Sequence, residues 1–164
     1  MDHTPLLLEM TAFDEGSAQR IQHFLKVYEL CRTIGLCEKL DARTQETLEA
    51  AALVHDIGIR PSLTVYGDVA GPHQEELGPA EARKLLGRLG YDSEMISRVC
   101  WLVGHHHTYD PVDGIDHQIL IEADFLVNLF ENNRPAETIR SAYEHIFRTE
   151  TGKLLCQRMF PNAF

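Results

Sequence analysis

The sequence contains no closely spaced pair of cysteines. Its four cysteines stand at positions 31, 37, 100 and 156, so no C-x-x-C motif is present. This spacing excludes a zinc ribbon and a thioredoxin-type redox site, because both need paired cysteines. We expect free thiols in a reducing compartment rather than disulfides.

Positive charge and long apolar runs are also scarce. The chain has 15 Lys and Arg against 25 Asp and Glu, a formal net charge of −10 at pH 7. Such a surface disfavours nucleic acid and anionic membranes as partners, since both are bound through clustered Lys and Arg. No stretch approaches the ~20 apolar residues of a membrane span, and the N-terminus lacks the basic start and apolar run of a signal peptide. These absences predict a cytoplasmic protein with no nucleic-acid and no membrane partner.

Apolar residues recur at helical spacing along almost the whole chain. The pattern predicts an all-α fold, a single-domain helical bundle over residues 1–164. Helices are expected at about 14–36, 41–56, 75–88, 93–103 and 116–132, with Asp41 and Ser93 as N-caps. The segment from residue 135 is again helical, with an interruption expected at Gly152. Residues 59–74 are expected to be irregular, because prolines and glycines punctuate them.

Several ionisable residues fall on the apolar stripes of these expected helices. His23, His55, His106 and Asp124 share a face with buried-type residues, and Asp56 follows His55 directly. Each residue alone could be a hydrogen-bonded core histidine or a carboxylate paired with an arginine. Burying all of them independently would be costly, whereas one divalent ion explains them together. Nitrogen and oxygen ligands suit Mn, Fe, Co, Ni or Zn, and the absence of cysteine argues against a purely structural zinc.

These residues also carry a family resemblance. Arg20-x-x-His23, Leu53-Val54-His55-Asp56-Ile57-Gly58 and Glu122-Ala123-Asp124-Phe125-Leu126 resemble the H…HD…D signature of the HD-domain superfamily of metal-dependent phosphohydrolases. The resemblance covers a core of about residues 15–130 and leaves a C-terminal helical extension of about 135–164 within one HD-like domain. It implies that His23, His55, Asp56 and Asp124 hold one metal ion.

A second ligand set is implied by the binuclear members of that superfamily. His73, His106 and His107 match the positions that hold a second ion there, with the aspartate of the HD pair, Asp56, as a bridging or water-orienting ligand. Because His105, His106 and His107 are consecutive, the match leaves open which two of them are ligands. We favour His106 and His107, because His106 shares a helix face with apolar residues. Surface or supporting roles remain the alternative for His73 and His105. The expected cofactor is therefore one or two divalent ions of Mn, Fe, Co, Ni, Zn or Mg.

The resemblance and the ligands together predict an enzyme. A metal ion lowers the pKa of bound water from 15.7 to ~7, so that hydroxide can attack a phosphate ester at neutral pH. The predicted function is a phosphohydrolase of the phosphomono- or phosphodiesterase type, acting on a nucleotide or another small phosphate ester. Arg20 and Arg60 are the candidate phosphate-binding residues, with a surface ion pair as the alternative for Arg20. Two other functions stay open: an HD-type mixed-valence di-iron oxygenase, and a non-catalytic nucleotide- or metal-binding module.

Overall fold

The computed structural model describes all residues, 1–164, and contains helices but no strand, which confirms the all-α fold class. In chain order the nine α-helices and one short 3₁₀ helix are α1 (Thr4–Phe13), α2 (Ala18–Cys37), α3 (Ala42–Val54), α4 (Ile59–Val65), α5 (Gly71–Arg88), α6 (Ser93–Val103), α7 (Gly114–Glu131), α8 (Ala136–His145), α9 (Glu150–Met159) and η1 (Pro161–Ala163).

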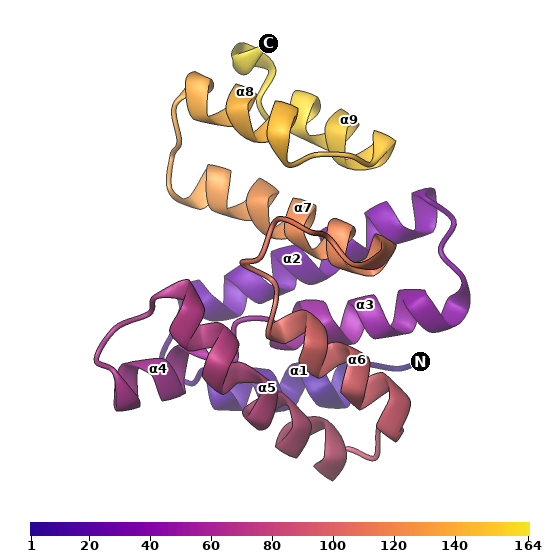
Figure 1. Cartoon of the computed structure of the whole chain (residues 1–164), viewed down its shortest axis with the longest axis vertical. Coiled ribbons are helices and arrows are strands. Elements are labelled where there is room, and N and C mark those ends of the chain that lie inside the picture. Colours follow the sequence, from indigo (N-terminus) through magenta and orange to yellow (C-terminus); the bar gives the residue numbers. More distant parts are fainter.

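Helices α2, α3 and α7 form the centre of the molecule. Each of the three packs against the other two, and α6 also packs on α3. Figure 1 shows α1, α4, α5 and α6 at one end of this centre, with α8 and α9 stacked beyond α7 at the other end. One continuous cluster of buried apolar side chains runs through these layers, from Leu6 in α1 to Phe147 before α9. The three central helices therefore contribute many of the fully buried side chains of the fold.

The helix starts follow ordinary capping chemistry. The Asp41 side chain accepts the backbone N–H groups of Arg43 and Thr44, so Asp41 caps α3 as predicted. The cap of α6 is Asp92, which accepts the N–H of Met95; the prediction of Ser93 was wrong by one residue.

Three local predictions differ from the structure. Helix α1 was not expected, and α4 occupies part of the segment expected to be irregular. Pro61 lies in the first turn of α4, where the backbone nitrogen needs no intrahelical partner, so this proline does not break the helix. The interruption expected at Gly152 is also wrong, because this glycine lies in the first turn of α9 and the chain turns before Thr149.

Gly152 is needed for close packing rather than for a break. A Cβ at this position would collide with the carboxylate of Glu122 in α7. That buried carboxylate accepts the backbone N–H groups of Arg148, at 2.6 Å, and Thr149, at 2.9 Å. It thereby fixes the turn between α8 and α9 against α7.

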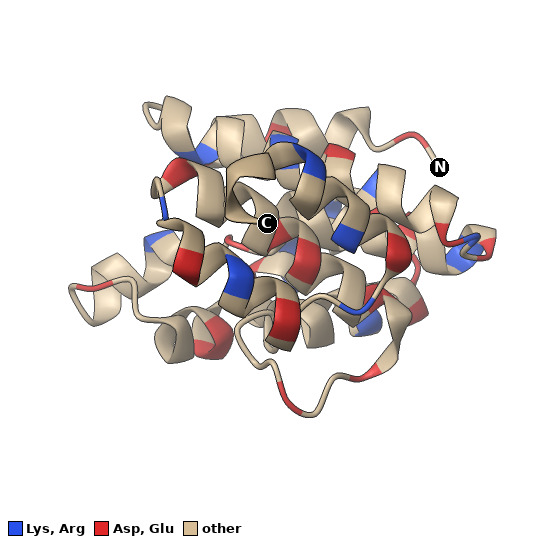
Figure 2. Ribbon diagram, turned by 90° about the horizontal axis from the view of Figure 1, so that it is seen from above, with Lys and Arg blue, Asp and Glu red and all other residues tan.

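The surface mixes both signs of charge. Figure 2 shows Lys and Arg distributed over several helices rather than gathered along one, with Asp and Glu between them. All four cysteines are free, and Cys37 alone is exposed. None of the helices combines the length and the apolar character that crossing a bilayer requires.

Candidate metal centre

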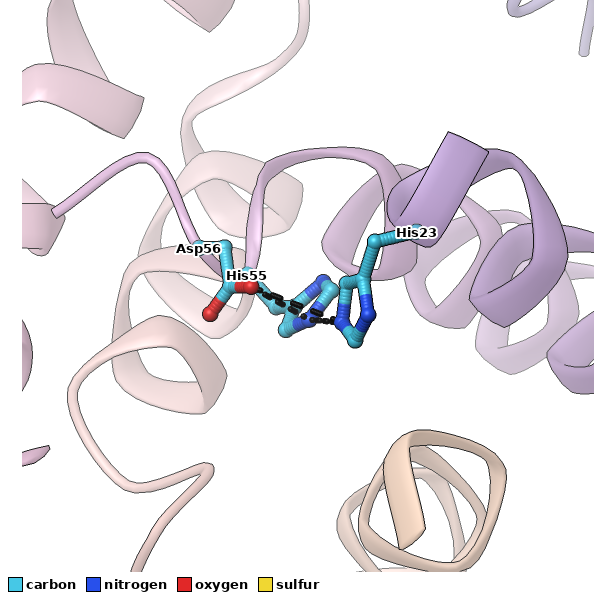
Figure 3. A group of neighbouring side chains, drawn as sticks. All are labelled: His23, His55 and Asp56. Carbon is cyan, nitrogen blue, oxygen red and sulfur yellow. Dashed lines mark hydrogen bonds and ion pairs between the residues drawn. The ribbon is translucent and has the colours of Figure 1, made fainter. Parts of the chain in front are cut away.

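The packing of the three central helices brings the predicted ligands together. His23 lies in α2, Asp124 lies in α7, and His55 and Asp56 follow directly after α3. His106 and His107 belong to the turn after α6, which packs on α3. Segments more than 100 residues apart in the sequence thus meet at one buried point. Figure 3 shows His23 and His55 with their rings adjacent and Asp56 beside them.

The first group of ligand atoms consists of two imidazole nitrogens and two carboxylate oxygens. His23 Nε2 lies 3.2 Å from His55 Nε2 and 3.1 Å from Asp124 Oδ1. Asp56 Oδ2 lies 3.4 Å from His23 Nε2 and 3.5 Å from His55 Nε2. His55 Nε2 is 3.6 Å from Asp124 Oδ1. Each of the two imidazole nitrogens therefore lies within 3.6 Å of both carboxylates.

A second group shares Asp56 with the first. The other carboxylate oxygen of Asp56, Oδ1, lies 3.5 Å from His106 Nε2. The ligand atoms of Asp56, His106 and His107 all lie within 4.8 Å of one another, as do those of His23, His55 and Asp56. Asp56 thus directs one oxygen toward each group, which is the arrangement that a bridging ligand needs.

Hydrogen bonds to the far side of each ring set the direction of the histidine lone pairs. His55 Nδ1–H donates to the carbonyl of Ala52, and His106 Nδ1–H donates to the carbonyl of Val103, each at 2.8 Å. A proton held at Nδ1 leaves Nε2 of the neutral ring with a free lone pair. When neutral, as metal binding requires, both rings therefore present an acceptor nitrogen to the centre.

His23 is oriented by a carboxylate that the sequence analysis missed. Its Nδ1–H donates to Glu131 Oε2 at 2.9 Å, and Lys26 Nζ donates to the other oxygen of Glu131 at 2.6 Å. Glu131 lies seven residues after Asp124 on α7 and therefore on the same helix face, two turns further on. That spacing was the signal in the sequence that could have found it.

The unpaired nitrogens of the second group fit a cation. His106 Nε2 and His107 Nε2 are buried and have no hydrogen-bond partner. Leaving such atoms unsatisfied costs about 1–3 kcal/mol each, so a ligand for them is expected. Burial, with a smaller contribution from His106, lowers the pKa of His107 to about 4, so its ring is neutral at pH 7. A neutral imidazole is the form that binds a metal ion.

The carboxylates of the centre are held in their charged form. Burial alone would raise the pKa of Asp124, but the hydrogen-bonded His23 ring and the nearby His55 ring outweigh it and bring the pKa well below the usual range. Burial likewise opposes the charge of Asp56, and His55 and His106 hold its pKa low. Burial lowers the pKa of His23, but Asp124 and Asp56 outweigh it and raise this pKa to about 9. A proton on His23 thus balances negative charge that a divalent ion would balance instead.

Two histidines near these residues in the sequence lie outside both groups. His73 Nδ1 is 2.7 Å from Asp68 Oδ1, and its ring stacks on Tyr66 with centroids 3.9 Å apart. His105 stacks on Trp101 and donates to that residue's carbonyl. From the run 105–107, the structure therefore brings the second and third histidines to Asp56. It does not bring His73 there.

The two candidate phosphate-binding arginines, Arg20 in α2 and Arg60 in α4, both contact residues at the end of α1. Arg20 Nη1 is 3.5 Å from Asp14 Oδ1, and Arg60 donates to the carbonyl of Phe13 and lies over its ring. Burial raises the pKa of Asp14. The charges of Arg20 and Arg60 oppose this rise, and the charge of Asp56 adds to it. Asp14 is therefore within electrostatic range of both arginines and of Asp56, and each arginine has a partner in the structure.

Comparisons with known proteins agree with this geometry. The HD-domain family model matches residues 20–147, which include every ligand of both groups. A crystal structure of a predicted HD superfamily hydrolase from an uncultured Thermotogales bacterium superposes with a TM-score of 0.68. It is 26% identical, and the match covers 98% of this chain and 86% of that one. No curated protein matches the chain significantly. The chain belongs to the HD-domain family and so to a superfamily of metal-dependent hydrolases.

Proposed function

We propose that this protein is a metal-dependent phosphohydrolase that acts on a small phosphate ester, of the phosphomono- or phosphodiesterase type. The observation that carries the proposal is the position of Asp56, whose two oxygens face two separate histidine groups. Such a shared carboxylate is what a pair of divalent ions requires. A pair of ions clamps the attacking and leaving oxygens of an in-line phosphoryl displacement.

The residues divide between two sites. His23, His55 and Asp124 would hold the first ion, His106 and His107 would hold the second, and Asp56 would contact both. When bound, the ions would supply a nucleophilic water at neutral pH and neutralise charge on the phosphoryl oxygens. The hydrogen bonds at the Nδ1 atoms keep the imidazoles in place for this role. Phosphoryl transfer needs mainly such positioning and charge neutralisation, and Arg20 and Arg60 could add to the latter.

Water is the expected nucleophile because the protein offers no alternative at the centre. Cys31 lies on the same face of α2 as His23, two turns further along. Its thiol is fully buried, and burial together with the charge of Asp124 raises its pKa well above the ordinary value. A thiol in this state is not ionised and is a poor nucleophile. The net charge of −10 favours a small substrate, a nucleotide among the candidates, over nucleic acid or a membrane surface.

The test is metal-dependent release of phosphate. Protein loaded with Mn²⁺, Co²⁺, Ni²⁺ or Mg²⁺ is assayed on nucleoside monophosphates, sugar phosphates and nitrophenyl mono- and diesters. We expect turnover that EDTA and Asp56→Asn abolish, whereas Asp68→Asn keeps it, because Asp68 contacts only His73 and its own backbone turn. Metal-loaded, folded protein that is inert on the whole panel would contradict the proposal. Bound iron with substrate-dependent oxygen uptake would favour the di-iron oxygenase, and melting shifts without turnover would favour a binding module.

A further inference from the structure

A cleft of ≈ 350 Å³ opens directly beside the metal centre. Two of its lining residues, His107 and Asp124, are the candidate metal ligands described above. From them it extends along α7 to the connection with α8 and reaches Arg134 and Thr138. Its volume lies at the low end of the range for small-molecule sites, so it suits a ligand of modest size.

Arg134 is the only cation that lines this cleft, and it is unpaired. Its side chain makes no ion pair and no hydrogen bond in the structure. Other cations near the centre are engaged, since Lys26 pairs with Glu131 and Arg20 with Asp14. In a chain with ten more acidic than basic residues, an exposed and unpaired arginine at the rim of a cleft is available for an anion from outside.

The rest of the cleft mixes polar side chains with the apolar surfaces of Phe125 and Leu129. The Asn128 side-chain amide donates to Asp124 Oδ1 at 2.8 Å, which connects the wall of the cleft to the metal centre. Asn132 follows one turn later and also lines the cleft. Tyr109 packs edge-on against Phe125, with ring centroids 5.1 Å apart, and closes the side nearest the turn after α6. The asparagines of this lining offer hydrogen-bond partners to a hydroxylated or charged group.

We propose that the substrate is a small phosphate ester that carries a second anionic group, a phosphate or a carboxylate, and that Arg134 binds this second group. This inference rests on the proposed function, because the ester phosphate is taken to meet the metal centre at the other end of the cleft. Hydrolysis breaks the P–O ester bond, the water oxygen joins phosphorus, and the leaving oxygen takes a proton. The second anion stays on the leaving group throughout.

The kinetic test compares substrates that differ only in the second anion. Fructose 6-phosphate is paired with fructose 1,6-bisphosphate, and glycerol 3-phosphate with 3-phosphoglycerate; the two pairs distinguish a phosphate from a carboxylate. We expect wild type to prefer the member with the second anionic group in at least one pair by about 10–100-fold in kcat/KM, the range for a charged hydrogen-bonded contact. Arg134→Gln should remove that preference by raising the KM of the substrates that carry the second anionic group. Arg134→Lys should restore part of the preference. Arg140→Gln is the matched control, because Arg140 bonds to the carbonyl of Ala163 outside the cleft.

Binding of a non-hydrolysable probe separates this inference from the proposed function. Propane-1,3-bisphosphonate and propylphosphonate are compared by thermal shift on metal-loaded protein. A preference for the bisphosphonate that Arg134→Gln abolishes supports the subsite even if no ester is hydrolysed, in which case the hydrolase proposal alone fails. Two results would overturn the subsite and leave the hydrolase proposal standing. One is that Arg134→Gln lowers kcat/KM equally for both members of each substrate pair. The other is that Arg134→Gln keeps the preference for the bisphosphonate.

Discussion

Glu131 offers a sharp test of how the metal centre is held. It is not a ligand, but it accepts the Nδ1–H of His23 at 2.9 Å and thereby fixes the ring whose Nε2 faces Asp124. Replacing such a supporting group weakens metal affinity by about 10–100-fold, which corresponds to about 1.4–2.7 kcal/mol. We expect Glu131→Ala to fall in this range. Glu131→Gln should lose less, because its amide oxygen can still accept the hydrogen bond although the charge is gone.

Two control variants distinguish this effect from a general loss of charge. Lys26 contacts Glu131 but is 39% exposed, and exposed ion pairs contribute about 0–1 kcal/mol, so Lys26→Gln should change metal affinity little. Glu137 is exposed and pairs only with Arg140, so Glu137→Gln should change nothing.

The assay is competition for Mn²⁺ against a fluorescent chelator at fixed pH, with urea unfolding in the presence and absence of metal. A larger dissociation constant must reduce the increase in unfolding free energy that saturating metal confers, by about 1.4–2.7 kcal/mol. The unfolding free energy of the metal-free protein should change less. Unchanged metal affinity in Glu131→Ala would refute the reasoning. An equal loss of stability with and without metal would show that Glu131 serves the fold alone.

Three further predictions follow from single positions. Asp56→Asn should lower turnover by at least roughly 10²-fold and reduce the metal content per chain, and full activity would contradict its shared position. Gly152→Ala should cost about 2–4 kcal/mol in urea unfolding, because the methyl group displaces the Glu122 carboxylate, whereas Gly87→Ala, with open space around it, should not destabilise. His117 accepts the N–H of Asp113 at Nδ1 and donates from Nε2 to the carbonyl of His105, and burial lowers its pKa below the ordinary 6.5. The unfolded chain therefore binds this proton first as the pH falls, so the contribution of His117 is present above about pH 6.5 and is lost below it. The stability difference between wild type and His117→Gln should shrink from pH 7.5 to pH 5, and a constant difference would contradict this.

Most of the fold could be read from periodicity and capping. The apolar repeats placed the central helices, and Asp41 caps α3 as expected. Two of the errors lie where proline and glycine were interpreted as breaks. Pro61 is in the first turn of α4, and Gly152 makes room for Glu122, a contact between distant parts of the chain that no local pattern shows.

The sequence predicted the ligands of the candidate site better than it predicted the residues around them. Buried-face positions and the HD resemblance pointed to His23, His55, Asp56 and Asp124, which the structure brings together. The same reasoning grouped His73 with the second set, where the structure instead pairs it with Asp68.

The surroundings of the site depend on tertiary packing. Glu131 supports His23 from another helix, and Arg134 lines a cleft that forms only when α7, the start of α8 and the turn after α6 meet. Helical spacing reveals which residues share a face, but it does not reveal which partner that face meets.

The central claim is that two groups of histidines share Asp56 around divalent ions, and metal content measures it directly. Purified protein, saturated with Mn²⁺ and freed of excess metal, is analysed by elemental mass spectrometry beside His23→Ala and His106→Ala. The account predicts two ions per chain in wild type and about one in each variant. An absence of tightly held metal, or a metal content that neither substitution changes, would contradict it.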